Sequence, residues 1–182
     1  MTPPRIAPGR RRDLGLVTWG FAHVAGRVMG TGPPNIFTTL GRHRRVFRGW
    51  LHFGGTLMPR GSLPRREAEL VILRVAHLRG SAYELAHHER LGLRAGISRE
   101  ELARLADGAT ADGWAPRERA LLAAVDELHA TGDLTDGTWS ELRAHLDEKE
   151  SIELLMLAGH YEMLAVVLGT LRVAPDRPRQ RA

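Results

Sequence analysis

The segment LPRREAELVILRVAHL, residues 63–78, is the feature that most constrains the fold. Pro64 is expected in the first turn of a helix, where its missing amide hydrogen breaks no hydrogen bond. Good helix formers follow it, and the apolar residues cover most of the helix circumference: Leu70, Val71, Leu73, Val75, Ala76 and Leu78. A helix that is apolar nearly all round is a buried helix. We therefore expect this helix at the centre of the fold.

Further helical segments, separated by breaks rich in Gly and Pro, fill the rest of the chain. Ser98 with Glu101, and Asp147 with Glu150, have the spacing of capping boxes at two helix starts. No strand-like alternation stands out, so we predict an all-α protein of six to eight helices. The predicted helices cover residues 16–29, 35–58 (as one or two helices), 81–94, 98–107, 116–130, 138–146 and 148–173.

The chain is expected to hold one domain with two basic appendages. Residues 1–32 are predicted to be a basic N-terminal extension with a short helix, of which residues 1–15 are extended. Residues 33–173 form the helical domain, and residues 174–182 form a basic tail. The last helix of the domain is apolar almost all round, so we expect it in the core or in a subunit contact.

The composition excludes several classes of function. The chain has no cysteine, which removes disulfides, thiolate metal sites and thiol chemistry. The net charge of +5 suggests nucleic acid, but 25 of the 26 basic residues are arginines, and they are scattered apart from Arg10–Arg12, Arg42–Arg45 and the tail after Pro175. The aromatic content of 5% is too low for a base-stacking platform, so we expect no nucleic acid. No secretory signal and no run of 18 apolar residues is visible. We expect a soluble cytoplasmic protein without membrane contact.

The stretch GSAYELAHH, residues 80–88, concentrates the polar chemistry of the chain. Ser81 and Glu84 fit a capping box that starts a helix after Gly80. On that helix Glu84 and His88 are four residues apart and share a face. Tyr83 and His87 form a second pair about 100° round the helix, so the two histidines do not point to one small site. The stretch is therefore a helix start, a catalytic pair, or both.

Three kinds of chemistry are open for this pair. A carboxylate beside an imidazole can hold and pass a proton near neutral pH. A metal needs at least one more ligand, and neither His77 nor His160 arrives at a recognisable spacing, so we expect no metal. A Ser81–His88 nucleophile pair lacks the strand–turn–helix elbow that would expose the serine. The acid–base hypothesis fits best.

Residues 69–98, ELVILRVAHLRGSAYELAHHERLGLRAGIS, resemble the core of the carboxymuconolactone decarboxylase superfamily, which includes the alkylhydroperoxidase D-like proteins. The resemblance extends over about residues 33–173 and implies an alkylhydroperoxidase D-like helical bundle. The peroxidase branch of this family carries a glutamate, then Cys-x-x-Cys, then a histidine. At the matching positions this chain has Glu69, Ser81, Glu84 and His88. Both thiols are replaced, so thiol peroxidase and disulfide reductase chemistry is excluded.

The resemblance implies a site in which Glu69, Glu84 and His88 are the catalytic residues. A helical hairpin that turns at Gly80 brings these side chains together. Two close carboxylates favour protonation of one of them, which is then a general acid. The namesake decarboxylase acts on a small lactone that carries a carboxylate, and this reaction needs a proton donor but no organic cofactor. We accordingly expect cofactor-free acid–base chemistry on a small organic acid or lactone.

Substrate binding is assigned to Ser81, Tyr83 and His160, and Arg74 is a candidate for holding a substrate carboxylate. His160 and Tyr161, in GHYEM, interrupt the most apolar helix. Either they form a core pair that is hydrogen-bonded locally, or His160 lines the site. Two alternatives are open: a non-catalytic binding protein on the same fold, and a metal-dependent enzyme using Glu84 and His88. The family also implies a homo-oligomer, a trimer or hexamer, with helices packed between subunits.

Overall fold

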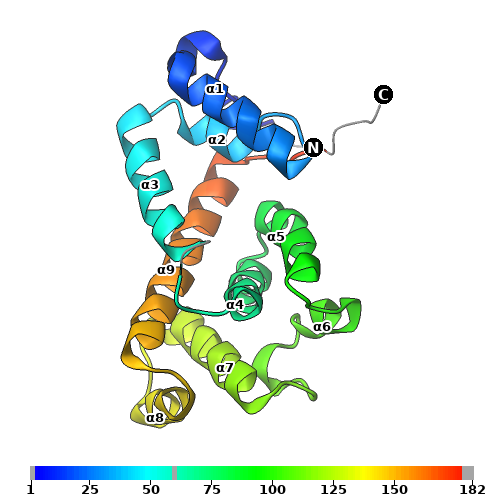
Figure 1. The fold of residues 1–182 in the computed structure, drawn as a ribbon, viewed down its shortest axis with the longest axis vertical. Coiled ribbons are helices and arrows are strands. Elements are labelled where there is room, and N and C mark those ends of the chain that lie inside the picture. Colours follow the sequence, from blue (N-terminus) through cyan, green and yellow to red (C-terminus); the bar gives the residue numbers. More distant parts are fainter. Residues whose placement is uncertain (1–2, 59–60, 178–182) are drawn as a thin grey trace. The chain divides into compact units, whose positions relative to one another are not determined.

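The computed structural model describes residues 3–58 and 61–177, which form nine α-helices, one short 3₁₀ helix and no β-strand (Figure 1). The predicted all-α class is confirmed. Seven of these helices have seven residues or more, which agrees with the expected six to eight. The other two, α2 and α6, are short helices of six residues each. The elements are α1 (Arg11–Met29), α2 (Asn35–Leu40), α3 (Arg44–Leu57), α4 (Arg65–Leu78), α5 (Ala82–Arg94), α6 (Arg99–Arg104), η1 (Gly108–Thr110), α7 (Pro116–Thr131), α8 (Asp136–His145) and α9 (Glu148–Leu171).

The chain divides into two compact units. The terminal unit comprises Met1–Gly55 together with Val167–Ala182, and the central unit comprises Thr56–Val166. The boundaries predicted for the N-terminal extension, the helical domain and the basic tail stay predictions. Parts of the extension (residues 1–2) and of the tail (residues 178–182) lie outside the described residues.

The central unit is built round α4, as its apolar sequence predicts. Every residue from Ala68 to Ala76 is buried, and α4 packs against α5 and α7. Burying each large apolar side chain contributes about 1.5–3 kcal/mol, so α4 is a principal source of stability for this unit. One cluster of the core joins α4 to the segments that follow α5: Leu70, Leu73, Ile97, Leu105, Trp114 and Leu122.

A tight turn after α4 reverses the chain. Gly80 adopts φ 59°, a conformation that L side chains rarely take. The Ser81 amide donates to the Ala76 carbonyl at 2.9 Å, and the Gly80 amide donates to the His77 carbonyl at 3.1 Å. These bonds satisfy the last carbonyl groups of α4. Because α5 begins two residues after Gly80, it packs back against α4, as the hairpin hypothesis requires.

Two of the predicted capping boxes are confirmed. At α6 the Ser98 hydroxyl accepts from the Glu101 amide at 3.2 Å, and Glu101 accepts from the Ser98 amide at 2.8 Å. At α9 the Glu150 amide donates to Asp147 at 2.8 Å, and the Asp147 amide donates to Glu150 at 3.0 Å. Each box satisfies two amides that have no carbonyl partner within the helix.

In the terminal unit, α1 begins at Arg11, although residues 1–15 are predicted to be extended. The reason is local: Asp13 accepts from the Arg10 amide at 2.8 Å and caps a first turn, which then kinks at Gly15 with φ 75°. The interior of this unit is aromatic. The rings of Phe21, Phe37 and Phe47 lie with centroids 5.3–6.2 Å apart, and Trp50 lies within 5.9 Å of Phe37 and Phe47. Tilted and edge contacts at these distances are the arrangements that aromatic rings prefer.

The long helix α9 is a core helix with one exposed face. By length and composition it is apolar enough to cross a membrane, with a mean hydropathy of 1.6, and it is the one such helix in the part of the chain that the structure describes. In the central unit, however, it buries Leu154, Leu157, Ala158 and Leu164. It also begins with the charged cap of Asp147 and Glu150. Its buried residues thus belong to the core of the central unit.

Candidate active site in the hairpin of α4 and α5

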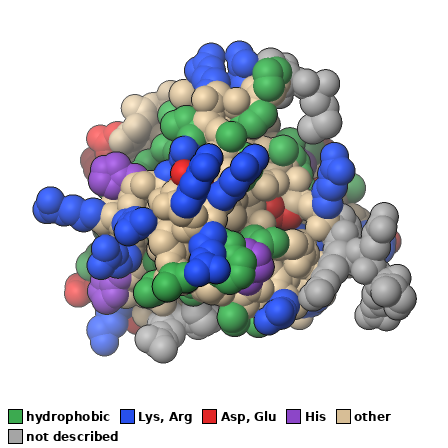
Figure 2. All heavy atoms as spheres, turned by 90° about the horizontal axis from the view of Figure 1, so that it is seen from above, with side chains coloured by type: hydrophobic (Ala, Val, Ile, Leu, Met, Phe, Trp, Pro, Cys, Tyr) green, Lys and Arg blue, Asp and Glu red, His purple; other side chains and the backbone are tan. Residues whose placement is uncertain are grey.

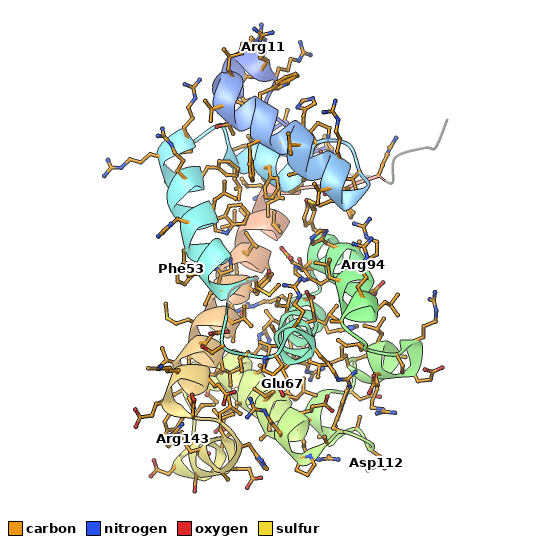
Figure 3. All side chains as sticks on the ribbon, in the orientation of Figure 1. Arg11, Phe53, Glu67, Arg94, Asp112 and Arg143 are labelled. Carbon is orange, nitrogen blue, oxygen red and sulfur yellow. The ribbon has the colours of Figure 1, made fainter. Side chains whose placement is uncertain are left out.

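The α4–α5 hairpin places His88 between two carboxylates. The Nδ1 atom of His88 lies 2.7 Å from Oε2 of Glu69, and its Nε2 atom lies 3.3 Å from Oε2 of Glu84. Glu69 comes from α4, whose first turn is marked by Glu67 in Figure 3, while Glu84 and His88 come from α5, which ends at Arg94. The three residues assigned to catalysis therefore meet, and each ring nitrogen of His88 has its own carboxylate.

All three side chains are withdrawn from solvent. Glu69 is 0% exposed, Glu84 3% and His88 4%. Burial alone lowers the pKa of His88, but the hydrogen bonds to Glu69 and Glu84 outweigh it, and the pKa of His88 is raised above its ordinary value. The arrangement therefore favours an imidazolium held between two carboxylates.

A fourth group, Arg65, completes the charge balance. Its guanidinium lies 2.5 Å from Oε1 of Glu69, one turn earlier on α4, and its side chain is 40% exposed. Arg65, Glu69, His88 and Glu84 thus form a row of alternating charges that runs from the surface into the core. With His88 protonated, the row carries no net charge, which makes its burial tolerable.

Glu84 ends this row with one oxygen uncommitted. Its Oε2 atom lies near His88, whereas its Oε1 atom is buried and has no hydrogen-bond partner. A buried carboxylate oxygen normally accepts a hydrogen bond. Among the described residues this oxygen therefore keeps an unused acceptor position in the core.

Two residues of α9 border the row. The ring of Tyr161 stands perpendicular to that of His88 with centroids 5.1 Å apart. Burial raises the pKa of Tyr161 well above its ordinary value, and the charges of Glu84 and Glu69 add to this effect, so its hydroxyl stays neutral. His160 is 6% exposed, and burial lowers its pKa although Glu84 lies close enough to act against that shift. Tyr161 is thus a neighbour of the site that sequence reasoning did not include among the site residues.

His87 differs sharply from the adjacent His88. Its ring lies 5.0 Å from that of His88 in a perpendicular arrangement. Burial lowers the pKa of His87 to about 3, and the nearby charges of His88, Arg90 and Arg65 act in the same direction. His87 therefore stays neutral near pH 7 and supplies packing rather than charge.

The capping box predicted at the start of α5 is wrong. Ser81 occupies the N-cap position with φ −81° and ψ 90°, and its side chain makes no capping hydrogen bond. Glu84, the other member of the box, turns instead towards His88 at 3.3 Å. A charged tertiary partner has thus displaced a local contact. Ser81 and Tyr83, both assigned to substrate binding, are buried, and Tyr83 lies about 100° round α5 from Glu84.

Arg74 does not serve the site, contrary to the hypothesis that it holds a substrate carboxylate. Its guanidinium is hydrogen-bonded and ion-paired to Asp126, and it donates to the carbonyl oxygens of Leu105 and Ala106 at 2.8 Å each. These contacts join α4 to α7 and to the segment before η1. Arg65 is the arginine of the site, and its position four residues before Glu69 was the signal that could have found it.

The residues that the structure describes contain no group of three or more His, Cys, Asp or Glu side chains arranged to hold a metal. In the geometry described above, both ring nitrogens of His88 face carboxylates, so neither nitrogen is free to bind a metal ion. A cavity of about 360 Å³ lies elsewhere, in the terminal unit between α1 and α3, and none of the three catalytic candidates lines it.

Comparison with known proteins defines the class first. The fold is similar to that of a peroxidase-related protein with an alkylhydroperoxidase AhpD core from Ralstonia eutropha JMP134 (TM-score 0.84, 18% identity, 96% of this chain and 94% of that chain). It is also similar to a peroxidase-related protein from Silicibacter sp. TM1040 (TM-score 0.82, 15% identity, 96% and 95%). A third similar structure is the debrominase Bmp8 (TM-score 0.78, 16% identity, 93% and 91%). The chain therefore has the AhpD-like fold.

Residues 44–127 match the model of the Carboxymuconolactone decarboxylase family, so this segment of the chain is similar to that family. The resemblance noted in the sequence is thus confirmed. The matched segment contains Glu69, Glu84 and His88, whereas His160 and Tyr161 lie beyond it. No curated protein sequence matches the chain significantly.

Proposed function

We propose that this protein is a cofactor-free acid–base catalyst that transfers a proton to or from carbon in a small organic acid or lactone. Decarboxylation and related proton transfers belong to this class. The observation that carries the proposal is the buried Oε1 atom of Glu84, which has no hydrogen-bond partner, while its Oε2 atom is held by His88. A carboxylate with one oxygen held by an imidazole and the other without a hydrogen-bond partner is suited to general acid–base catalysis.

The proposed chemistry needs no external oxidant or reductant. As a base, Glu84 takes a proton from a carbon next to a carbonyl or carboxyl group, and the C–H electron pair moves into an enolate. As an acid, Glu84 returns the proton to carbon. In a decarboxylation the C–C electron pair forms the enolate and carbon dioxide leaves. Glu84, which has first taken a proton from solvent, then gives that proton to carbon and returns to the carboxylate. His88 stabilises Glu84 as its charge changes, while Glu69 and Arg65 hold the His88 ring.

Tyr161 is suited to assist this step. Its hydroxyl stays protonated because its pKa is raised, and its ring lies against His88. A neutral hydroxyl can donate a hydrogen bond to an oxygen that becomes negative during the reaction. A small ring compound is a reasonable size for the substrate, because the AhpD-like debrominase Bmp8 forms a complex with 2,3,4-tribromopyrrole.

Thiol chemistry is not part of the proposal. The chain contains no cysteine, and serine and glutamate occupy the two positions at which the peroxidase branch has thiols. Serine and glutamate cannot form the thiolate or the disulfide on which that chemistry depends.

The test is proton exchange at carbon. The purified protein is incubated in D₂O with small lactones and 3-oxo acids, and NMR follows the replacement of hydrogen by deuterium and the loss of carboxylate. We expect Glu84→Gln to slow the reaction by about 10²- to 10⁴-fold. The matched control is Glu89→Gln, which changes an exposed glutamate on the same helix and should react at the wild-type rate.

Equal rates for wild-type protein and Glu84→Gln would overturn the proposal. Saturable binding of these acids without exchange or loss of carboxylate would also overturn it, and would favour a binding protein on the same fold. A reaction that depends on added divalent metal would favour the metal-dependent alternative.

We propose that the protein acts in the cytoplasm. We further propose that a second copy of the chain covers the exposed face of α9. Ile152, Met156, Met163 and Val166 are 47–63% exposed on this face, with Gly159 at its centre. Two antiparallel copies would place Ile152 near Val166 and Met156 near Met163, because the spacing is nearly symmetric about Gly159. A contact with two-fold symmetry of this kind suits a hexamer and not a trimer.

Analytical ultracentrifugation tests the oligomer. Met163→Glu should shift the sedimentation coefficient towards that of a single chain, because it places a charge in the proposed contact. Leu93→Glu, on an exposed position of α5, is the control and should leave the coefficient unchanged. A wild-type protein that sediments as a monomer would refute this contact.

A further inference from the structure

The terminal unit contains a half-open apolar cavity of about 360 Å³ between α1 and α3. Its apolar lining consists of Leu14, Leu16, Val17, Phe21, Phe47 and Leu51. Phe47 and Leu14 are buried, so the floor is fixed, whereas Leu16 is 66% exposed and Val17 87% exposed at the rim. A volume of this size falls in the range of small-molecule sites in proteins.

Two arginines complete the lining. Arg44 and Arg48 lie one turn apart on α3, and both are exposed. The kink at Gly15 makes room for one of them: a Cβ added at Gly15 would lie 3.0 Å from the Arg44 guanidinium. The cavity therefore has an apolar floor and a cationic edge.

The carboxylates near these arginines in the chain are committed elsewhere. Residues 1–55 contain nine arginines and one acidic residue, Asp13. Asp13 accepts from the Arg10 amide at 2.8 Å and pairs with Arg42 at 3.3 Å. In the C-terminal part of the same unit, Asp176 accepts from the Asn35 amide at 2.7 Å. Figure 2 shows arginine and hydrophobic side chains beside one another on the face seen from above.

We propose that this cavity binds a small amphipathic carboxylate, that is, a molecule with an apolar body and one carboxylate. The body displaces water from the floor formed by Leu14 and Phe47 and from the apolar side chains around it, which favours binding through the hydrophobic effect. The carboxylate pairs with the guanidinium groups of Arg44 and Arg48, which bind planar anions with two parallel hydrogen bonds. This site is separate from the Glu69–His88–Glu84 site and does not depend on the function proposed for it.

Isothermal titration calorimetry with sodium decanoate, below its micelle concentration, tests the proposal. We expect one saturable site per chain, weaker binding of neutral 1-decanol, and no binding of acetate, which lacks the apolar body. The double variant Arg44→Gln/Arg48→Gln should bind decanoate at least about tenfold more weakly. The matched control is Arg45→Gln/Arg27→Gln, which removes the same charge from exposed positions outside the cavity and should bind like wild type.

A second pair of variants tests the rim and keeps the fold intact. Val17→Asp places a negative charge at the cavity mouth and should weaken decanoate binding at least about tenfold. Val28→Asp, at a position of α1 that is 79% exposed and outside the lining, should not. Equal weakening by both double arginine variants, or no saturable decanoate binding, overturns the proposal. The proposal is also overturned if Val17→Asp has a lower mass than the wild-type protein in ultracentrifugation. That result would mean that a second copy of the chain occupies the cavity in the wild-type protein.

Discussion

The two units of this protein handle charge in opposite ways. In the central unit, arginines pair with carboxylates that are distant in the sequence: Arg66 with Glu101 and Glu118, and Arg117 with Glu67 and Glu150. The active-site candidate is the buried extreme of the same pattern. In the terminal unit, residues 1–55 contain nine arginines and one acidic residue, and a cluster of aromatic rings joins α1, α2 and α3.

The contrast shows where each unit is able to support function. Paired charges can be buried, because each ion replaces the water that its partner loses. The central unit can therefore hold an imidazole and two carboxylates away from solvent. The unpaired arginines of the terminal unit stay at the surface, where they are available to an anion from outside. Removing one charged side chain should therefore change the free energy of unfolding by different amounts in the two units.

The largest expected effect is that of Glu69→Ala. This change leaves the His88 imidazolium without its closest carboxylate and leaves Arg65 without its partner. Breaking a buried ion pair costs about 3–5 kcal/mol, and urea denaturation should show a loss of that size. In the terminal unit, Arg44→Ala should change the free energy of unfolding by less than about 0.5 kcal/mol. Similar losses for the two variants would contradict the contrast between the units.

Arg74→Met should have the next largest effect and should separate structure from catalysis. The change leaves the Ala106 carbonyl oxygen without its donor and the Asp126 carboxylate without its cation, and it removes one of the two donors to the Leu105 carbonyl oxygen. Unsatisfied buried polar groups cost about 1–3 kcal/mol each, so the loss in chemical denaturation should be at least about 2 kcal/mol. The folded variant should keep its rate of proton exchange. A folded Arg74→Met protein without exchange activity would return Arg74 to the site.

The sequence allowed prediction of contacts that follow from helix periodicity. The burial of α4, the boxes at α6 and α9, and the shared face of Glu84 and His88 all depend on spacings of three or four residues. The position of Glu69 opposite His88 followed from the family resemblance and from the turn at Gly80. Both carboxylates beside His88 are therefore among the residues that the sequence predicts.

The errors concern side chains whose partners are far away in the chain. Arg74 is a candidate for the site in the sequence, but its carboxylate partner in the structure, Asp126, is 52 residues later. The Ser81–Glu84 box satisfied every local rule, and it failed because His88 competes for Glu84. Tyr161 was not assigned to the site because nothing local links it to residues 80–88. Long-range partners of this kind cannot be read from periodicity in a single sequence.

His87 provides a pH-dependent test of how the central unit buries charge. Its pKa in the folded protein, about 3, lies below its ordinary value of 6.5. Between these two values the unfolded chain binds more protons than the folded chain, so stability falls as the pH falls below about 6.5. The contribution is about 1.4 kcal/mol per pH unit, or about 2 kcal/mol at pH 5. His87→Asn should lose correspondingly less stability than wild type in urea titrations from pH 7 to pH 5.

His88 should respond in the opposite direction. Because its folded-state pKa is raised, its stabilising contribution is fully present below the ordinary value of 6.5 and is lost as the pH rises through the folded-state value. The difference in stability between wild type and His88→Asn should therefore shrink at alkaline pH. Parallel pH profiles for His87→Asn and His88→Asn would show that the two neighbours do not differ in charge.

The smallest expected effect concerns the unpaired arginines of the terminal unit. Like charges on one surface repel each other at low ionic strength and are screened at high salt. Arg45→Gln should therefore raise the free energy of unfolding by about 0.2–0.5 kcal/mol at low salt, and the gain should vanish near 0.5 M NaCl.

In the central unit, removal of an arginine charge should have the opposite effect on stability, because Arg117 is paired with Glu67 and Glu150. Arg117→Gln should destabilise the protein at both salt concentrations, since partly buried pairs are screened less than exposed charges. A gain in stability from Arg117→Gln, or a loss from Arg45→Gln, would reverse the assignment of paired and unpaired charge to the two units.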